Sequence, residues 1–154
     1  MPEIISNYIE LHICYKSNAG HEYLLLKRSE KNRIFPGIWQ MITGGIEVGE
    51  TTQEAVVREL KEETGITKAK LYVIPMVNSY YLSAVDKVCL SPVFLCEAKN
   101  KDVKISDEHS EYKWVSFEEA KELIHWHNQV ESMCVIEEFL NNEKKFKKLV
   151  ELEK

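Results

Sequence analysis

Three glutamates at helical spacing are the residues of this sequence with the most distinctive chemistry. Glu59, Glu62 and Glu63 stand at i, i+3 and i+4 of segment 52–64, which would place their carboxylates on one side of a helix. Like charges at this spacing destabilise a helix by about 0.2–0.5 kcal/mol per pair, so a bound cation would offset the repulsion. Oxygen-only ligands favour Mg²⁺ or Mn²⁺. For an isolated cluster, a solvated acidic helix face is the alternative.

The residues around these glutamates form a longer motif. From Gly44 to Ile66 the sequence reads GGIEVGETTQEAVVRELKEETGI. At every specified position it is similar to the Nudix box, G-x5-E-x7-R-E-U-x-E-E-x-G-U, in which U is a bulky aliphatic residue. The flanking segments 36–39 and 114–120 also resemble the family, so the resemblance spans most of the chain. A motif of this length favours the metal-bound interpretation of the glutamates.

The resemblance to Nudix hydrolases implies a fold and a set of metal ligands. The fold would be α/β, a Nudix-type α/β/α sandwich with a mixed sheet. Glu59 and Glu63 would be the leading ligands of Mg²⁺, with Mn²⁺ as an alternative. Glu62 would be a further ligand or the base that activates water. Gly44 would let the backbone approach the cation and offer its carbonyl oxygen.

The remaining motif residues are expected to support this site. Arg58 would orient the carboxylates, and Glu50 would secure Arg58 or the loop. Gly45 and Gly65 would only satisfy backbone conformations. The reaction implied is attack of a cation-activated water on phosphorus while a carboxylate removes its proton.

A further carboxylate is expected from the loop before the last strand. In many Nudix hydrolases an acidic residue from such a loop completes the metal site or acts as the base, and Glu108 is the candidate here. A solvated loop glutamate is the alternative, with Glu111 as the substitute if the register differs. Which glutamate serves as the general base therefore stays open.

Residues outside the motif are needed to recognise the substrate, and the candidates are cationic, aromatic or hydrogen-bonding. They are Lys27, Arg28, Trp39, Tyr80, Tyr81, Trp126 and Asn128. Each has an alternative role. The two cations could lie at an exposed strand end, the aromatic residues could pack internally, and the segment around Trp126 could close the core.

Hydrophobic periodicity predicts the elements that must position these side chains. We expect one domain, residues 1–154, with strands at 8–16, 23–28, 71–77, 88–96 and 112–115. The apolar run at 88–96 predicts a central strand. Helices are expected at 52–64, between the cap Thr51 or Thr52 and Gly65, at 117–124, and from 129 or 132 towards 152. Residues 80–86 would connect the third and fourth strands.

The composition excludes several classes of protein. The net charge of −5 argues against binding to a nucleic-acid backbone, although a free nucleotide could bind through a metal ion. The four cysteines are scattered without CxxC spacing, so we expect buried thiols. No apolar stretch approaches the ~20 residues that cross a bilayer. We therefore expect a cytoplasmic protein that acts on a small nucleotide-like molecule; a homodimer is an open alternative.

The substrate class rests on the segments outside the motif. Segments 39–47, 112–114 and 126–128, with Glu108-His109, resemble bacterial dATP and dihydroneopterin triphosphate pyrophosphohydrolases. We therefore expect cleavage of a nucleoside or pterin triphosphate to a monophosphate and pyrophosphate. A dinucleoside polyphosphate or nucleotide-sugar hydrolase is the alternative within the family. A noncatalytic nucleotide-binding module is a more remote one, because such modules normally lose the glutamates. The base, the attacked phosphorus and the pathway stay open.

Overall fold

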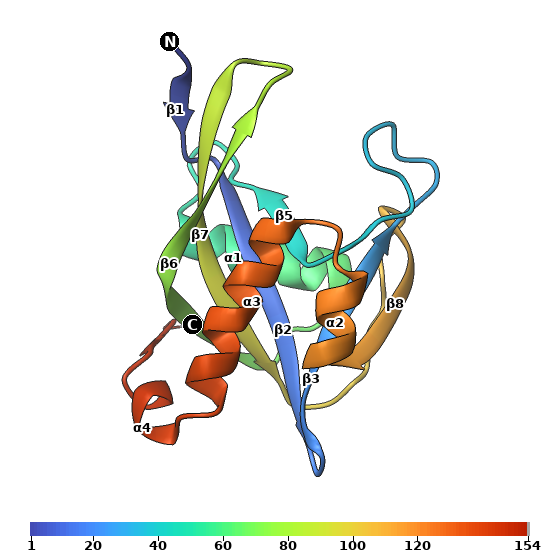
Figure 1. The fold of residues 1–154 in the computed structure, drawn as a ribbon, viewed down its shortest axis with the longest axis vertical. Helices are drawn as coiled ribbons and strands as arrows, with labels where there is room; N and C mark the ends of the chain where they lie inside the picture. The colour runs from blue at the N-terminus through green and yellow to red at the C-terminus, as the bar shows by residue number, and fades with distance from the viewer. Residues whose placement is uncertain (154) are drawn as a thin grey trace.

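The core of the molecule is one mixed β-sheet (Figure 1). The computed structural model describes residues 1–153. Their strands are β1 (Glu3–Ile5), β2 (Tyr8–Ser17), β3 (Gly20–Arg28), β4 (Trp39–Gln40), β5 (Ile42–Gly45), β6 (Ala69–Leu82), β7 (Lys87–Ala98), β8 (His109–Ser116) and β9 (Val150–Glu151). The order is β4-β3-β2-β7-β6-β9, while β1 pairs with β7, β5 with β2 and β8 with β3.

Strand β7 lies at the centre of this sheet, as its continuous apolar run predicts. It pairs in parallel with β1 and β2 and antiparallel with β6. Strand β2 is buried on both faces: Ile9 and Leu11 belong to the apolar cluster on one side, and Cys14 belongs to the cluster on the other. Burial on both faces explains why the pattern of β2 alternates only loosely.

Helices cover both faces of the sheet, which confirms the predicted α/β arrangement. Figure 1 shows α1 (Thr52–Thr64) behind the sheet and α2 (Phe117–Leu123) and α3 (His127–Leu140) in front of it. Val56 and Leu60 of α1 pack into one apolar cluster, while Met133 and Ile136 of α3 pack into the other. The site-bearing helix is therefore held against one face by its own apolar stripe.

The bounds of α1 agree with the prediction because both ends have clear capping residues. The side chain of Thr51 accepts a hydrogen bond from the backbone of Glu54, and the Glu54 side chain accepts one from the backbone of Thr51. Gly65 ends the helix with φ of 72°, a left-handed conformation that glycine adopts without strain. Val56 and Leu60 of this helix are buried, whereas the adjacent Val57 is 49% exposed.

The predicted long C-terminal helix is wrong. Helix α3 ends at Leu140, and a short helix, α4 (Glu143–Phe146), follows after Asn141 and Asn142. The Asn142 side chain caps α4 by accepting a hydrogen bond from the Lys145 backbone N–H. Asparagine is one of the residues preferred at this N-cap position. The chain then forms β9 on the edge of β6, which an extrapolated helical pattern does not reveal.

Two smaller predictions also need correction. Tyr80 and Tyr81 do not lie in a connecting loop but continue β6, whose hairpin with β7 projects, with β1 beside it, past the end of β2 (Figure 1). Cys14, Cys89 and Cys96 are buried as expected, but Cys134 is exposed on α3. Among residues 1–153, no helix is long and apolar enough to cross a membrane.

Candidate active site

A cavity of about 600 Å³ lies where α1 faces β5 and the loop before β8. Six carboxylates line it: Glu47, Glu59, Glu62, Glu63, Asp107 and Glu108. The other lining residues are Thr43, Gly44, Gly45, Arg58 and Ser106. The structure thus gathers the motif glutamates and Glu108 around one space, although they come from segments far apart in the sequence.

The backbone of Gly44 in β5 lies directly against the Glu59 side chain of α1. A Cβ atom built on Gly44 would lie 2.3 Å from Cδ and 2.7 Å from Oε1 of Glu59. Real Cβ atoms do not approach other heavy atoms this closely, so only glycine fits while Glu59 keeps its place. At Gly45 a Cβ atom would meet only the Asn7 carbonyl oxygen, at 4.0 Å. The first glycine of the motif is therefore required by packing against the carboxylate.

Arg58 joins the loop and the helix through its whole guanidinium group. Its Nε and Nη2 donate to the two carboxylate oxygens of Glu50, at 2.7 and 2.9 Å. Nη1 donates to Glu59 at 2.8 Å and to Glu62 at 3.2 Å. The paired hydrogen bonds with Arg58 hold the pKa of Glu50 below its usual range. The ion pair between Arg58 and Glu50 fixes the loop before α1 relative to the helix.

Gly45 has a further role that was not predicted from the sequence. Its carbonyl oxygen accepts a hydrogen bond of 2.7 Å from Nη2 of Arg58. The expectation that Gly45 only satisfies a backbone conformation is therefore incomplete. Gly65, by contrast, has the left-handed conformation expected of it.

Glu63 is the most perturbed carboxyl group of the site. Its residue is 5% exposed, and its Oε2 makes no hydrogen bond. Burial, followed by the charges of Glu108 and Glu59, raises the pKa of Glu63 to about 9. Without a cation, Glu63 is therefore protonated near neutral pH, because its carboxyl group is buried and lies close to two other acidic side chains.

His109 lies directly beside Glu63 and was not among the site residues predicted from the sequence. Its Nδ1 is 3.5 Å from Oε2 of Glu63, and neither ring nitrogen makes a hydrogen bond. Burial lowers the pKa of His109, which favours the neutral imidazole. The only sequence signal that could have placed His109 beside Glu63 is its position immediately after Glu108.

The donor atoms of the site fit a hard divalent cation. Within residues 1–153, no three His, Cys, Asp or Glu side chains are already gathered closely enough to hold a metal ion. Glu63 nevertheless has a buried oxygen without a partner, and Glu59 lies directly against the backbone of Gly44. All of these donors are oxygen atoms, the ligands that Mg²⁺ and Mn²⁺ prefer.

Of Glu108 and Glu111, the two candidates for the further carboxylate, Glu108 is the one that lines the cavity, and a register shift between β3 and β8 separates them. Lys27 pairs with Glu111, but Arg28 pairs with His109, so one residue of β8 is passed over. Glu111 accepts a hydrogen bond of 2.9 Å from Lys27 and does not line the cavity. Glu108 does line it, with an exposed residue surface.

The three substrate candidates nearest to β4 do not line this cavity. Lys27 lies 5.9 Å from the ring centroid of Trp39 and Lys113 lies 5.1 Å from it. Trp39 is half-buried and packs against the apolar cluster on the α3 side. The Nε of Arg28 donates to the Ile34 carbonyl at 3.1 Å. These residues are engaged with each other and with the loop after β3.

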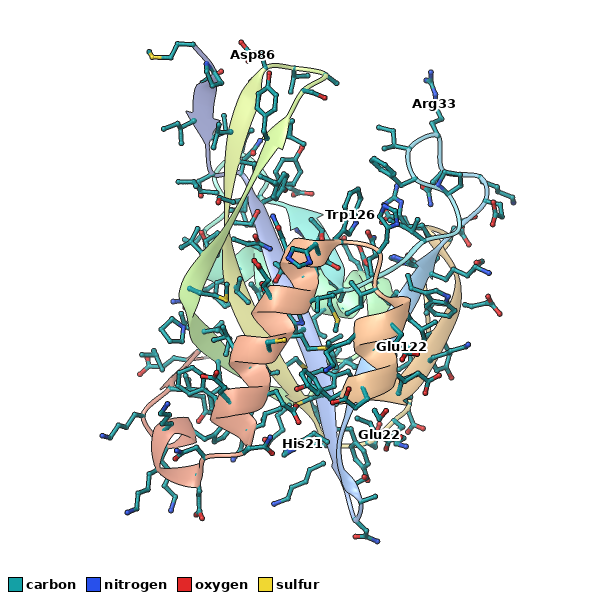
Figure 2. The ribbon with its side chains drawn as sticks, in the orientation of Figure 1. His21, Glu22, Arg33, Asp86, Glu122 and Trp126 are labelled. Atoms are coloured by element: carbon teal, nitrogen blue, oxygen red, sulfur yellow. The ribbon has the colours of Figure 1, made fainter. Side chains whose placement is uncertain are left out.

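The four later candidates separate into two groups. Tyr81 is 57% exposed and donates to Asp86 at 2.8 Å in the projecting β6–β7 hairpin, with half-buried Tyr80 next to it. Trp126 lies close to the start of α3 (Figure 2) and donates to Gln40 at 3.2 Å. Asn128 donates to the Ser79 carbonyl at 2.8 Å and so ties α3 to β6.

Two contacts near Trp126 were not predicted from the sequence. The Phe35 ring lies 4.6 Å from the Trp126 ring, edge to face, with Phe35 half exposed and at φ of 49°. Gln129 donates at 3.0 Å to Thr43, which lines the carboxylate-lined cavity. This chain of contacts connects the cavity to the start of α3.

Comparison with known proteins agrees with this geometry. The profile of the NUDIX domain matches residues 12–134. The chain is 34% identical over 114 residues to the nucleoside triphosphatase NudI of Klebsiella pneumoniae. This match covers 68% of this chain and 79% of that protein. The crystal structure of the MutT protein from Methanosarcina mazei is similar, with a TM-score of 0.71, 30% identity, and coverage of 94% and 97%.

A third similarity concerns the fold alone. The dihydroneopterin triphosphate pyrophosphohydrolase of Escherichia coli has a TM-score of 0.72 at 23% identity, with 88% of this chain and 94% of that chain covered.

Taken with the motif geometry, the NUDIX profile match and the NudI similarity show that this chain belongs to the NUDIX family. It is an enzyme of that family, a Nudix pyrophosphohydrolase.

Exchange of Gly44 tests the close packing against Glu59. In Gly44→Ala, the new methyl group must displace the Glu59 carboxylate, so we expect affinity for Mn²⁺ to fall by roughly ten-fold or more. Gly45→Ala is the matched control, because space is available there. Mn²⁺ titration followed by electron paramagnetic resonance measures both. Equal affinities in the two variants would contradict the packing argument.

The pH dependence of stability tests the state of Glu63. Its pKa is about 9 in the folded protein against 4.5 for the ordinary group, so the folded state binds the extra proton between these values. The contribution of Glu63 to the stability of the cation-free protein should therefore fall as pH rises from about 4.5 to 9. We expect Glu63→Gln to flatten this fall in urea unfolding, and Glu131→Gln, an exposed control, to retain it. An unchanged slope in Glu63→Gln would refute the assignment.

Proposed function

We propose that this enzyme hydrolyses nucleoside triphosphates to the monophosphate and pyrophosphate, with Mg²⁺ or alternatively Mn²⁺ bound by the motif carboxylates. The observation that carries the proposal is the carboxylate-lined cavity framed by Gly44 and Arg58. The similarity to NudI, a nucleoside triphosphatase, supports this substrate class. A small nucleotide also suits an acidic protein with a net charge of −5, since it can bind through a cation.

Within this proposal, the burial of each carboxylate suggests its role in cation binding or in proton transfer. Glu59 and Glu63 would hold the cation together with the Gly44 carbonyl, because both side chains are buried against β5 and the loop before β8. When bound, the cation would neutralise the polyphosphate charge and make water more acidic. Glu62 and Glu108 are exposed carboxylates that could accept the proton of the attacking water. Glu108, which lines the cavity with Glu59 and Glu63, would alternatively complete the cation site.

Arg58 contributes by holding carboxylates in place. Its two bonds to Glu50 and its bond to the Gly45 carbonyl fix the guanidinium group. The remaining nitrogen, Nη1, then donates to Glu59 and Glu62 and sets the distance between them. Arg58 is thus available to orient both a proposed ligand and a proposed base without contacting the substrate itself.

The nucleobase would lie towards the start of α3. The bond from Gln129 to Thr43 connects the catalytic cavity to this region, where Trp126 and Phe35 offer aromatic surface. Phe35 is half exposed, and a non-glycine residue at positive φ often marks a functional position. Trp126 and Asn128 remain substrate candidates in this proposal. Tyr81, bonded to Asp86 in the projecting hairpin, loses support.

The finer substrate proposal is dATP or dihydroneopterin triphosphate, on the resemblance of segments 39–47 and 126–128. Dinucleoside polyphosphates and nucleotide sugars are the alternatives within the family. We further propose a cytoplasmic location, where free nucleoside triphosphates are available. A panel of these compounds, with Mg²⁺ and analysis of the products, distinguishes the substrate classes.

Pyrophosphate release is the direct test of the proposed reaction. We expect the wild-type protein with Mg²⁺ to release pyrophosphate from at least one nucleoside or pterin triphosphate. Glu59→Gln should lower kcat by roughly 100-fold or more while circular dichroism stays unchanged, since a proposed cation ligand is lost. Glu122→Gln is the control, an exposed carboxylate on α2 across the sheet (Figure 2).

Two results would contradict the proposal. If wild-type protein releases no pyrophosphate from any triphosphate of the panel, the reaction assigned here is wrong. If Glu59→Gln and Glu122→Gln keep equal activity, Glu59 is not part of the catalytic site.

A further inference from the structure

The loop between β3 and β4, residues 29–38, is tied to the catalytic loop by the carbonyl oxygen of Glu108. The backbone N–H of Ser29 donates to this oxygen at 2.9 Å. The side-chain Nδ2 of Asn32 donates to the same oxygen, also at 2.9 Å. One carbonyl beside the cavity therefore receives two hydrogen bonds from a segment that contributes no lining residue.

Asn32 differs from its neighbours in being turned towards the protein. It is half-buried, whereas Lys31 and Arg33 are exposed, and Arg33 lies near the tip of the projecting loop (Figure 2). The backbone N–H and Nδ2 of Asn32 both donate to the Ser29 carbonyl, at 3.0 and 3.2 Å. Its amide thus closes the first turn of the loop and also reaches across to Glu108.

Glu108 has few other restraints. It precedes β8, which begins at His109, so its carbonyl is outside the named strand. Its own backbone N–H donates to Oγ of Ser106 at 3.4 Å, and the N–H of His109 donates to the Ser106 carbonyl at 3.2 Å. These bonds are longer than the two from the loop. The carbonyl that accepts the Asn32 hydrogen bond belongs to a residue that lines the cavity together with Glu59 and Glu63.

We propose that Asn32 is a positioning residue that fixes Glu108 for cation binding through the Glu108 carbonyl. The inference rests on the proposed function, in which Glu108 serves the cation site. Fixing the backbone at Glu108 restricts where its carboxylate can lie relative to Glu59 and Glu63. Partners of this kind typically change metal affinity or activity by about 10–100-fold. Loss of the Asn32 bonds should therefore weaken cation binding before any substrate is present.

Two substitutions remove the donor group in different ways. Asn32→Ala deletes the amide, while Asn32→Asp keeps the shape but replaces the donor with a carboxylate, which cannot donate to a carbonyl. Lys31→Ala is the matched control on the same loop. Its side chain is exposed, and the hydrogen bond from its backbone to Ser29 is retained.

The first measurement is Mn²⁺ titration of the substrate-free proteins by electron paramagnetic resonance. We expect both Asn32 variants to bind Mn²⁺ about ten-fold more weakly than wild type, and Lys31→Ala to bind it equally well. In turnover of a triphosphate, kcat should fall while KM changes little. Unchanged Mn²⁺ affinity in the Asn32 variants, even with a lower melting temperature, would show a merely structural role and overturn the inference.

A double-mutant cycle tests whether Asn32 acts through Glu108. In a Glu108→Ala background, Asn32→Ala should cause little further loss of Mn²⁺ affinity, since the carboxylate to be positioned is gone. Additive losses would overturn the inference. Failure of the proposed function is distinguishable. Wild-type protein that binds Mn²⁺ but hydrolyses no triphosphate would refute that function, while an Asn32 effect on Mn²⁺ binding would still support the positioning role.

Discussion

The contact between the Gly44 backbone and the Glu59 carboxylate is the constraint on which the rest of the site depends. It brings β5 against α1 so closely that any side chain at position 44 would have to displace the Glu59 carboxylate. The apolar stripe of α1, with Val56 and Leu60 in the core, supports this approach from one side. Arg58 supports it from the other by joining Glu50, Gly45 and Glu59. Burial of Glu59 and Glu63 follows from this packing.

Burying these carboxylates has an energetic cost that the fold retains. Glu63 keeps an oxygen without a hydrogen bond, and burial with its charged neighbours raises its pKa to about 9. His109, neutral and without hydrogen bonds, lies on its other side. A bound cation would satisfy the free oxygen and favour the ionised form. In the proposed function, the stability given up in the cation-free protein therefore becomes affinity for the cation.

Much of the fold and the centre of the site could be predicted from sequence because their signals are local. Helix α1 has capping residues at both ends, and its glutamates and Arg58 are fixed by helical spacing. Segments whose structure depends on distant partners could not be predicted. Strand β9 forms only because β6 offers an edge, and the bond from Asn32 to Glu108 spans 76 positions. The contact of Phe35 with Trp126 likewise joins two loops that periodicity does not relate.

The most direct test of the account is to locate the cation. In a crystal of the wild-type protein grown with Mn²⁺, anomalous scattering should give a peak between the carboxylates of Glu59 and Glu63. The metal should lie about 2.1–2.3 Å from their oxygens, as for hard divalent ions. A well-occupied peak elsewhere, or none at saturating Mn²⁺, would contradict the claim that this packing exists to hold a cation.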